Sequence, residues 1–455
     1  MNRILIILLL SIFSMSLFSQ DITGDWMGKV TINTMKLDVA FHIEKMADNY
    51  ALTMDIPLQG LSGVKAESAT LIDSILTISF PDLKLEYKGN LSENGEIIGS
   101  FMQRGNPIPL NLKKGTIKLN RPQEPKPPFS YYSEEITFMN VADTLKLAGT
   151  LTLPKKDGKF PVVIIVSGSG PQNRDGEMMG HKPYFLIADQ LTRNGIGVLR
   201  FDERGVGASE GDFNTVTIAV SSSDVKSAVD YLKTRKEIDA SKIGLIGHSI
   251  GGIVAPKVAS ETENISFLVL LAAPGVNGDI LMLSQKAAIE KTMGLNEMQI
   301  AQGQELVKGA YDIIKNSKLD NTSLKDSINS FYSNKYGKMF PENQRKMLVA
   351  QITSFEVASL IQSKPSEYLE KIDVPVLAMN GDKDLQVPAD ENLMVIKNSL
   401  TKGSNDSVKI MKLENLNHLF QECKTGAMSE YSEIEQTFSP TALDVITSWI
   451  QEQTK

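Results

Sequence analysis

Cysteine and histidine are scarce in this chain of 455 residues, which has one cysteine, Cys423, and four histidines. A lone cysteine cannot form an intrachain disulfide, so we expect a fold that does not depend on covalent cross-links. The cysteine and the histidines show no spacing typical of zinc ligands, and we predict no metal site. Cys423 is interpreted as a packing residue and not as a nucleophile.

Basic residues are also fewer than acidic residues. Lys and Arg number 47 against 54 Asp and Glu, which gives a formal net charge of −7. This balance leaves no basic surface for nucleic acid, so we expect no nucleic-acid partner. Hydrophobic residues make up 42% of the chain, which is ordinary for a globular protein and sufficient for a sizeable core.

Long apolar runs are missing too, apart from the N-terminus. Residues 1–19 start with the basic Arg3 and continue with an apolar run that three serines interrupt. The run is short for a membrane span, and its basic start and the small residue Ser19 are typical of a cleaved export signal. We therefore expect an exported protein, periplasmic or secreted, that is not stably inserted in a membrane after cleavage.

The rest of the chain shows two kinds of pattern. Residues 20–119 alternate short strand-like runs with turns, which predicts a small antiparallel β domain, either a barrel or a sandwich. Four prolines fall in residues 120–128, so residues 120–129 are predicted to be a stiff linker. Residues 130–455 alternate buried strands with helices, which is typical of a doubly wound, mostly parallel α/β sheet. Within them, residues 277–368 hold more helix than one crossover needs and predict a helical cap.

One pentapeptide carries the chemistry, Gly247-His248-Ser249-Ile250-Gly251. A short apolar strand over 243–246 precedes it and a helix over 250–260 follows, so we expect Ser249 on a sharp turn that lifts its hydroxyl clear of the backbone. The N-terminus of that helix favours anionic charge at the same place. Ser249 is therefore the candidate nucleophile, and the main-chain N–H of Ile250 is a candidate oxyanion donor.

A serine nucleophile needs a base, and the four histidines offer few choices. His42 lies in the first domain, His248 directly precedes the nucleophile and is expected to point to the other face of its strand, and His181 lies in an earlier loop. His418 follows the last predicted strand, where a loop residue can reach back to Ser249. We predict that His418 is the base.

The carboxylate that orients this base is expected after the strand over 374–379. Asp382 and Asp384 both occur there, and the pattern of residues alone does not choose between them. Either one gives the chain order Ser, Asp, His that α/β-hydrolases use.

From residue 131 onward the chain resembles an exported α/β-hydrolase of the serine-esterase and aminopeptidase-like group. The matching pieces are the segments 167–171, 202–209, 247–251, 381–388 and 417–418. In that group the acid is the fourth residue of G-x-x-D-x-x-V-P, so the resemblance implies Asp384. The second oxyanion donor is expected from the loop after the strand over 161–166, and Ser169 is the candidate by position.

These residues predict a serine hydrolase that cleaves a small-molecule carboxylic ester through an acyl-enzyme, without a cofactor. Two alternatives stay open. One is a peptidase or amidase on the same triad, in which Glu290, Glu297 or Glu305 of the cap would bind a substrate amine; the other is a binding protein on a catalytically dead scaffold. The N-terminal β domain is interpreted as structural or as the site of homodimer formation, and ligand binding inside it is a further alternative. The other substrate-binding residues are unknown from sequence.

Overall fold

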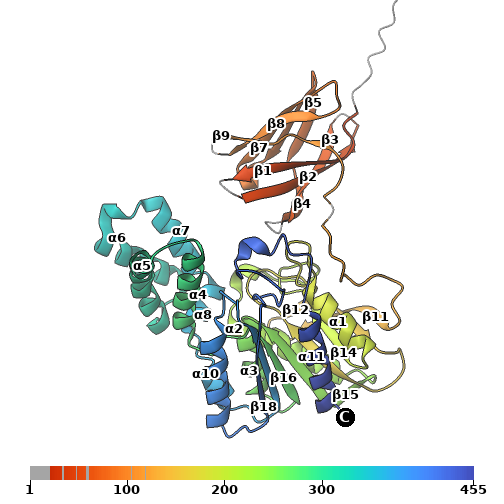
Figure 1. The fold of residues 1–455 in the computed structure, drawn as a ribbon, viewed down its shortest axis with the longest axis vertical. Helices are drawn as coiled ribbons and strands as arrows, with labels where there is room; N and C mark the ends of the chain where they lie inside the picture. The colour runs from red at the N-terminus through yellow and green to blue at the C-terminus, as the bar shows by residue number, and fades with distance from the viewer. Residues whose placement is uncertain (1–20, 33–34, 48, 58–60, 104, 118) are drawn as a thin grey trace, which may run out of the picture. The chain divides into compact units, whose positions relative to one another are not determined.

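The computed structural model describes residues 21–32, 35–47, 49–57, 61–103, 105–117 and 119–455. The chain divides into two compact units, residues 1–118 and residues 119–455 (Figure 1). The predicted export signal, residues 1–19, lies outside the described residues. None of the helices in the described ranges has both the length and the apolar character that a membrane span requires.

The described part of the first unit is all β, as its alternating pattern predicted. Two five-stranded antiparallel sheets have the orders β10-β1-β2-β3-β4 and β5-β6-β7-β8-β9. Rings from both sheets meet in the interior, where Phe41 of β2 contacts Tyr87 of β7 edge to face at 5.4 Å between ring centroids. The bounds are β1 Gly24–Ile32, β2 Met35–Lys45, β3 Tyr50–Ile56, β4 Leu61–Lys65, β5 Ser68–Ile72, β6 Ile75–Phe80, β7 Leu85–Leu91, β8 Ile97–Gln103, β9 Asn106–Pro109 and β10 Lys113–Lys114.

One histidine bridges two carboxylates in this unit. His42 of β2 pairs across the sheet with Asp25 of β1, and its Nδ1 lies 2.8 Å from Oδ1 of Asp25. Its Nε2 lies 3.1 Å from Oδ2 of Asp55 on β3. Both ring nitrogens are therefore satisfied within the sheet.

The second unit is built on an eight-stranded mixed sheet with the order β11-β12-β14-β13-β15-β16-β17-β18. The antiparallel hairpin β11-β12 joins β14 at one edge, and all strands from β14 to β18 run parallel. The strands β13 and β16 are apolar throughout because helices cover both faces of the sheet. The bounds are β11 Tyr132–Asn140, β12 Leu145–Leu153, β13 Phe160–Val166, β14 Gly197–Phe201, β15 Ile238–His248, β16 Phe267–Leu271, β17 Val376–Gly381 and β18 Val408–Leu413.

Helices cover the sheet in two layers (Figure 1). The helices α1 (Pro183–Arg193) and α11 (Pro440–Gln453) pack on one face. The helices α2 (Ile218–Lys233), α3 (Gly251–Ala259) and α10 (Ala389–Lys402) pack on the other. This arrangement is the predicted doubly wound α/β fold.

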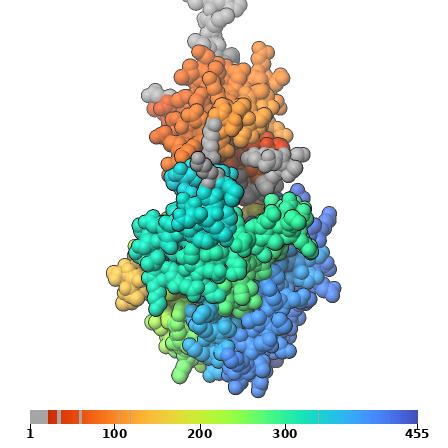
Figure 2. Space-filling model, turned by 90° about the vertical axis from the view of Figure 1, so that its left-hand side faces the viewer, coloured from red at the N-terminus to blue at the C-terminus, as the bar shows by residue number. Residues whose placement is uncertain are grey.

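Between β16 and β17 the chain forms the predicted helical cap, whose outer surface Figure 2 shows in green to cyan. Its helices pack around a core of their own that includes Tyr311, Ile328 and Tyr332. The last long helix, α8, also reaches the sheet unit, because Leu360 belongs to the core beneath α2 and α3. The bounds are α4 Gly278–Thr292, α5 Glu297–Asn316, α6 Asn321–Tyr336, α7 Glu342–Ile352, α8 Phe355–Gln362 and α9 Ser366–Leu369.

The second unit begins at Leu119, earlier than the predicted start at residue 130. The proline-rich segment 120–129 belongs to this unit because several of its side chains are bonded to it.

Candidate active site

Ser249 lies between β15 and α3, at the predicted strand-to-helix turn. Its φ is +54°, a left-handed conformation that is strained for a residue with a side chain. The turn is tight enough to demand glycine on both sides. A Cβ atom at Gly251 would lie 2.2 Å from the carbonyl oxygen of Val166, and one at Gly247 would lie 2.3 Å from the carbonyl oxygen of Gly251. The glycines of the pentapeptide therefore serve the packing of this turn.

His418 and Asp384 come together at the ends of two neighbouring strands. Nδ1 of His418, in the loop after β18, lies 2.8 Å from Oδ2 of Asp384, in the loop after β17. The other oxygen of Asp384 accepts hydrogen bonds from the main-chain N–H groups of Gln386, at 2.8 Å, and Val387, at 2.9 Å. Both side chains are buried, with exposed fractions of 5% for His418 and 0% for Asp384.

Asp382, the competing acid, faces elsewhere. Its Oδ1 accepts a hydrogen bond from the main-chain N–H of Asn415 at 2.7 Å. The carboxylate that contacts the candidate base is therefore that of Asp384.

The Oγ atom of Ser249 makes no hydrogen bond to any of the residues that the structure describes. Its backbone is held instead, because its N–H donates to the carbonyl of Leu271 at 2.9 Å. Ser249 is 9% exposed. The hydroxyl is thus unengaged within the described chain.

His248, beside the nucleophile, links two loops of the site. Its Nε2 lies 3.1 Å from the carbonyl oxygen of His418, and its Nδ1 lies 3.2 Å from the hydroxyl of Tyr184. That hydroxyl also accepts the main-chain N–H of Gly168 at 3.2 Å. Burial, and then the neighbouring His418, lower the pKa of His248 to about 4, so its ring is neutral at neutral pH. Because a carbonyl only accepts, Nε2 carries the proton and Nδ1 accepts from Tyr184.

The loop after β13 lies against the nucleophile. A Cβ atom at Gly168 would be 3.1 Å from the Cβ atom of Ser249. The main-chain N–H groups of Ser169 and Ile250, the two predicted oxyanion donors, form no hydrogen bond with another residue of the described ranges. Two free donors therefore remain on the two segments that flank Ser249.

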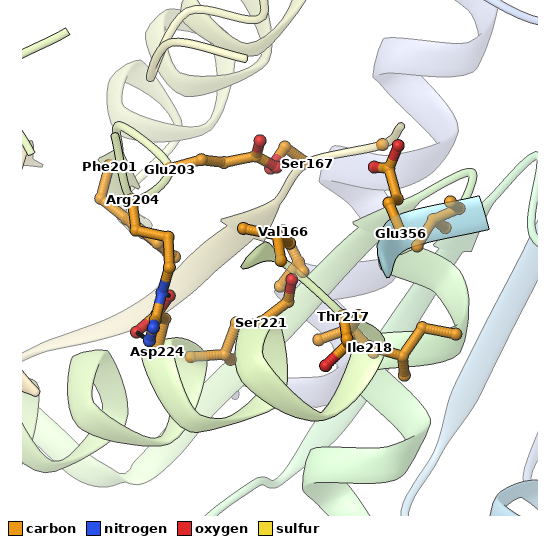
Figure 3. A pocket seen from close by; sticks show the side chains of 15 residues that line it. Val166, Ser167, Phe201, Glu203, Arg204, Thr217, Ile218, Ser221, Asp224 and Glu356 are labelled. Carbon is orange, nitrogen blue, oxygen red and sulfur yellow. Dashed lines mark hydrogen bonds and ion pairs between the residues drawn. The ribbon is translucent and has the colours of Figure 1, made fainter. Parts of the chain in front are cut away.

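A pocket opens beside this loop (Figure 3). The carboxyl groups of Glu203 and Glu356, which the sequence analysis did not assign to the site, line it. Its other lining residues are Val166, Ser167, Gly168, Phe201, Arg204, Val216, Thr217, Ile218, Ser221, Asp224, Val225, Ile250 and Val254.

Glu203 accepts hydrogen bonds from the hydroxyl of Ser167 and from the main-chain N–H of Gln172, the latter at 3.2 Å. Burial is the main cause that raises the pKa of Glu203 to about 8, and the charges of Glu356 and Asp224 raise it further. Burial raises the pKa of Glu356 as well. Glu356, on cap helix α8, accepts the main-chain N–H of Gly170 at 2.9 Å.

Neither glutamate forms an ion pair with a lysine or arginine in the described part of the chain, whereas their acidic neighbours do. Asp202 is held by Arg174, with Nη2 and Oδ2 2.7 Å apart, and Asp224 is held by Arg204, with Nη2 and Oδ1 2.6 Å apart. The segment 202–209 is thus tied to two other segments by ion pairs. Of the acidic residues that line the pocket, Glu203 and Glu356 are therefore the ones without a basic partner in the described part of the chain.

The cap acids proposed from sequence lie elsewhere. Glu290 pairs with Lys286, and Glu305 pairs with Lys335 at 2.7 Å. Glu297 is exposed in the first turn of α5. None of these three glutamates lines the pocket. Their positions in the sequence could not show which cap residues face the pocket, because that depends on how the cap helices pack.

The sheet order, the cap and the turn at Ser249 together define an α/β-hydrolase. The sequence model for serine aminopeptidases of family S33 matches residues 176–418, which is more than half of the chain. The chain therefore belongs to that family, and it is a hydrolase.

Among curated proteins, the chain is 26% identical over 274 residues to Esterase EstD of Thermotoga maritima, which covers 60% of this chain and 58% of that protein. It thus spans less than two thirds of that relative. It is also 24% identical over 253 residues to an uncharacterized 31.7 kDa protein of Escherichia coli, covering 54% of this chain and 80% of that one.

Among solved structures, the esterase Pf2001 of Pyrococcus furiosus is 18% identical, with a TM-score of 0.46 over 75% of this chain and 100% of its own. Est1E of Butyrivibrio proteoclasticus, solved with ferulic acid, is 18% identical, with a TM-score of 0.41 over 70% of this chain and 98% of its own.

Proposed function

We propose that this hydrolase cleaves small carboxylic esters through an acyl-enzyme on Ser249. The observation that carries the proposal is the buried hydrogen bond between His418 and Asp384, at the strand ends of the same sheet that presents a strained, unbonded serine. The name of the relative EstD, an esterase, supports an ester as substrate.

The chemistry follows from the orientation of the imidazole. Asp384 accepts a hydrogen bond from the N–H at Nδ1 of His418, so Nε2 of His418 is left as the base. Ser249 attacks the ester carbonyl carbon as its proton passes to Nε2. The oxygen of the tetrahedral intermediate accepts hydrogen bonds from the N–H groups of Ile250 and Ser169.

Collapse of that intermediate breaks the bond to the alcohol oxygen, which takes the proton from His418 and leaves. Water then attacks the acyl-enzyme, with His418 again accepting a proton, and the acid is released from Ser249.

The experiment compares the wild type with S249A in turnover of p-nitrophenyl acetate and in labelling by a fluorophosphonate. We expect S249A to lose at least roughly 10³-fold in kcat/KM and to lose all labelling, because the covalent route is removed. The control S260A changes a serine at the far end of α3 and should behave as the wild type. Labelling that persists in S249A would contradict the proposal, and absent labelling in the wild type would favour a binding protein.

The two uncompensated glutamates favour a second candidate, hydrolysis of an ester or amide whose acyl group carries a free amine. An ammonium group beside Glu203 and Glu356 would stabilise the charged forms of these two carboxyl groups, which their burial otherwise disfavours. An aminoacyl p-nitroanilide is the test substrate. If this candidate holds, E356Q raises KM for the anilide and leaves KM for p-nitrophenyl acetate unchanged; equal effects on both substrates would exclude it.

A further inference from the structure

The segment that joins the two units in sequence is bonded to a loop near the candidate base. Oε1 of Gln123 accepts the main-chain N–H of Thr437 at 2.6 Å and that of Phe438 at 3.1 Å. Its Nε2 donates to the carbonyl of Phe438 at 2.8 Å. The amide orientation is unambiguous, since the oxygen faces two donors and the nitrogen faces an acceptor.

Arg121 bonds the same segment to the start of that loop. Its Nη2 donates to the carbonyl of Met179 at 2.7 Å and to that of Ser432 at 3.3 Å. The side chain is buried and forms no ion pair with another residue in the described ranges, and burial lowers its pKa. A guanidinium held by carbonyls alone is a costly arrangement, so this contact is more than incidental surface packing.

The loop that Gln123 and Arg121 bind, residues 431–439, contacts the turn at residues 417–420, which carries His418. The ring of Phe438 stacks on that of Phe420 at 5.1 Å and 16°. The N–H of Ser439 donates to the carbonyl of Phe420 at 2.7 Å, and the N–H of Phe420 donates to the carbonyl of Asn417 at 3.0 Å. Phe420 has a φ of +59°, so the turn from 417 to 420 is strained and needs such support.

The loop also reaches the acid. Tyr431 accepts a hydrogen bond from Nε2 of Gln386 at 3.2 Å, and the main-chain N–H of Gln386 is one of the two donors to Asp384. The loop from 431 to 439 therefore contacts the turn that carries the base and a residue that donates a hydrogen bond to the acid.

We propose that Gln123 is a positioning residue, which holds the loop 431–439 so that the turn at 417–420 keeps His418 in register with Ser249. The inference rests on the proposed function of His418 as the base. Gln123 does not touch the reacting atoms and acts through Phe438 and Phe420. Residues 120–129, predicted from sequence to be a linker, would then contribute to the geometry of the active site.

The test uses the full chain and compares Q123A with E124A. Glu124 forms an ion pair with Lys182 at 3.0 Å, and within the described ranges its side chain makes no hydrogen bond or ion pair with the loop or the turn, so it is a matched control on the same segment. Two quantities are measured: kcat and KM for p-nitrophenyl acetate, and hydrogen exchange of peptides that cover residues 416–421. Thermal unfolding shows that each variant is folded at the assay temperature.

We expect Q123A to lower kcat about tenfold or more, because small misplacement of a catalytic group is costly, and to leave KM within about twofold. Exchange of the turn should become faster in Q123A and not in E124A. Q123E keeps the acceptor for both N–H groups and should recover part of the lost kcat.

Unchanged exchange at 416–421 in Q123A would overturn the inference, as would a folded Q123A with wild-type kcat. A wild type without turnover would count against the proposed function and not against the positioning role of Gln123. The exchange data would then decide that role by themselves: faster exchange supports it and unchanged exchange refutes it.

Discussion

Nδ1 of His418 and Oδ2 of Asp384 lie 2.8 Å apart, although the two residues are 34 positions apart in the chain. Because the other oxygen of Asp384 is held by two main-chain N–H groups, its carboxylate is fixed and selects the tautomer of the histidine.

The first prediction concerns this pair. D384N would present an amide to Nδ1 and favour the wrong tautomer, so we expect kcat for an ester to fall roughly 10³- to 10⁴-fold with little change in KM. D382N removes a carboxylate that accepts a hydrogen bond from the main-chain N–H of Asn415 and does not contact the base, and it should retain wild-type turnover. Equal losses in the two variants would assign the effect to folding and not to the base.

The second prediction concerns Tyr184, whose hydroxyl joins Gly168 to His248. Y184F keeps the ring and removes the hydroxyl, which leaves a buried N–H and a buried ring nitrogen without partners at about 1–3 kcal/mol each. We expect lower thermal stability and a roughly tenfold lower kcat, because the oxyanion loop loses its anchor. Y131F, whose hydroxyl bonds to Asp189 away from the site, serves as control and should keep its kcat.

The third prediction is a pH dependence that Glu203 causes. Its pKa in the folded chain is about 8 and its ordinary value is 4.5, so the folded state binds the proton more tightly than the unfolded state. The contribution of Glu203 to stability is therefore greatest below pH 4.5, falls as the pH rises from 4.5 to 8 and then levels off, with a slope no steeper than about 1.4 kcal/mol per pH unit.

Denaturant unfolding of E203Q and the wild type across this range measures the effect. The free energy of unfolding of E203Q relative to the wild type should rise with pH, because glutamine has no proton to lose. Parallel curves for the two proteins would show that Glu203 is not the source.

The fourth prediction concerns His42 in the first unit. Desolvation lowers its pKa, but the hydrogen bonds to Asp25 and Asp55 outweigh it and raise the pKa above 6.5 overall. The stabilisation by the charged ring is thus fully present below pH 6.5 and is lost as the pH rises through the raised folded pKa.

H42Q should remove that dependence, because a glutamine side chain carries no titratable charge. The chain has two tryptophans, and Trp26 is buried in the first unit, so its fluorescence reports on this unit when Trp449 is replaced by phenylalanine. In the W449F background, we expect melting temperatures that fall between about pH 6 and pH 8 when His42 is present and that stay level when H42Q is added. An equal dependence of melting temperature on pH in the two proteins would contradict a role for the hydrogen bonds of His42 to Asp25 and Asp55.

Local patterns in the sequence were sufficient to predict the fold class and the strand-turn-helix segment that carries Ser249. Apolar strands such as Phe267–Leu271 must be buried on both faces, and a β-type alternation in residues 20–119 excludes a helical first unit. The glycines at 247 and 251 signal a turn with no room for a Cβ at those two positions, which is a property of a few consecutive residues. The loop position of His418 follows from the order of parallel strands, whose ends meet at one edge. The choice of Asp384 over Asp382 came from the resemblance to the hydrolase family and not from strand order.

The pocket acids and the contacts of Gln123 were decided by tertiary structure. Glu356 meets Gly170 across 186 positions and Gln123 meets Phe438 across 315, and neither residue lies in a motif of its own. Whether a glutamate is a surface residue, like Glu305, or a buried group with a raised pKa, like Glu203, depends on which distant segments remove water from it. Sequence patterns report periodicity and turns between near neighbours, whereas desolvation and long-range hydrogen bonds exist only once the chain has packed.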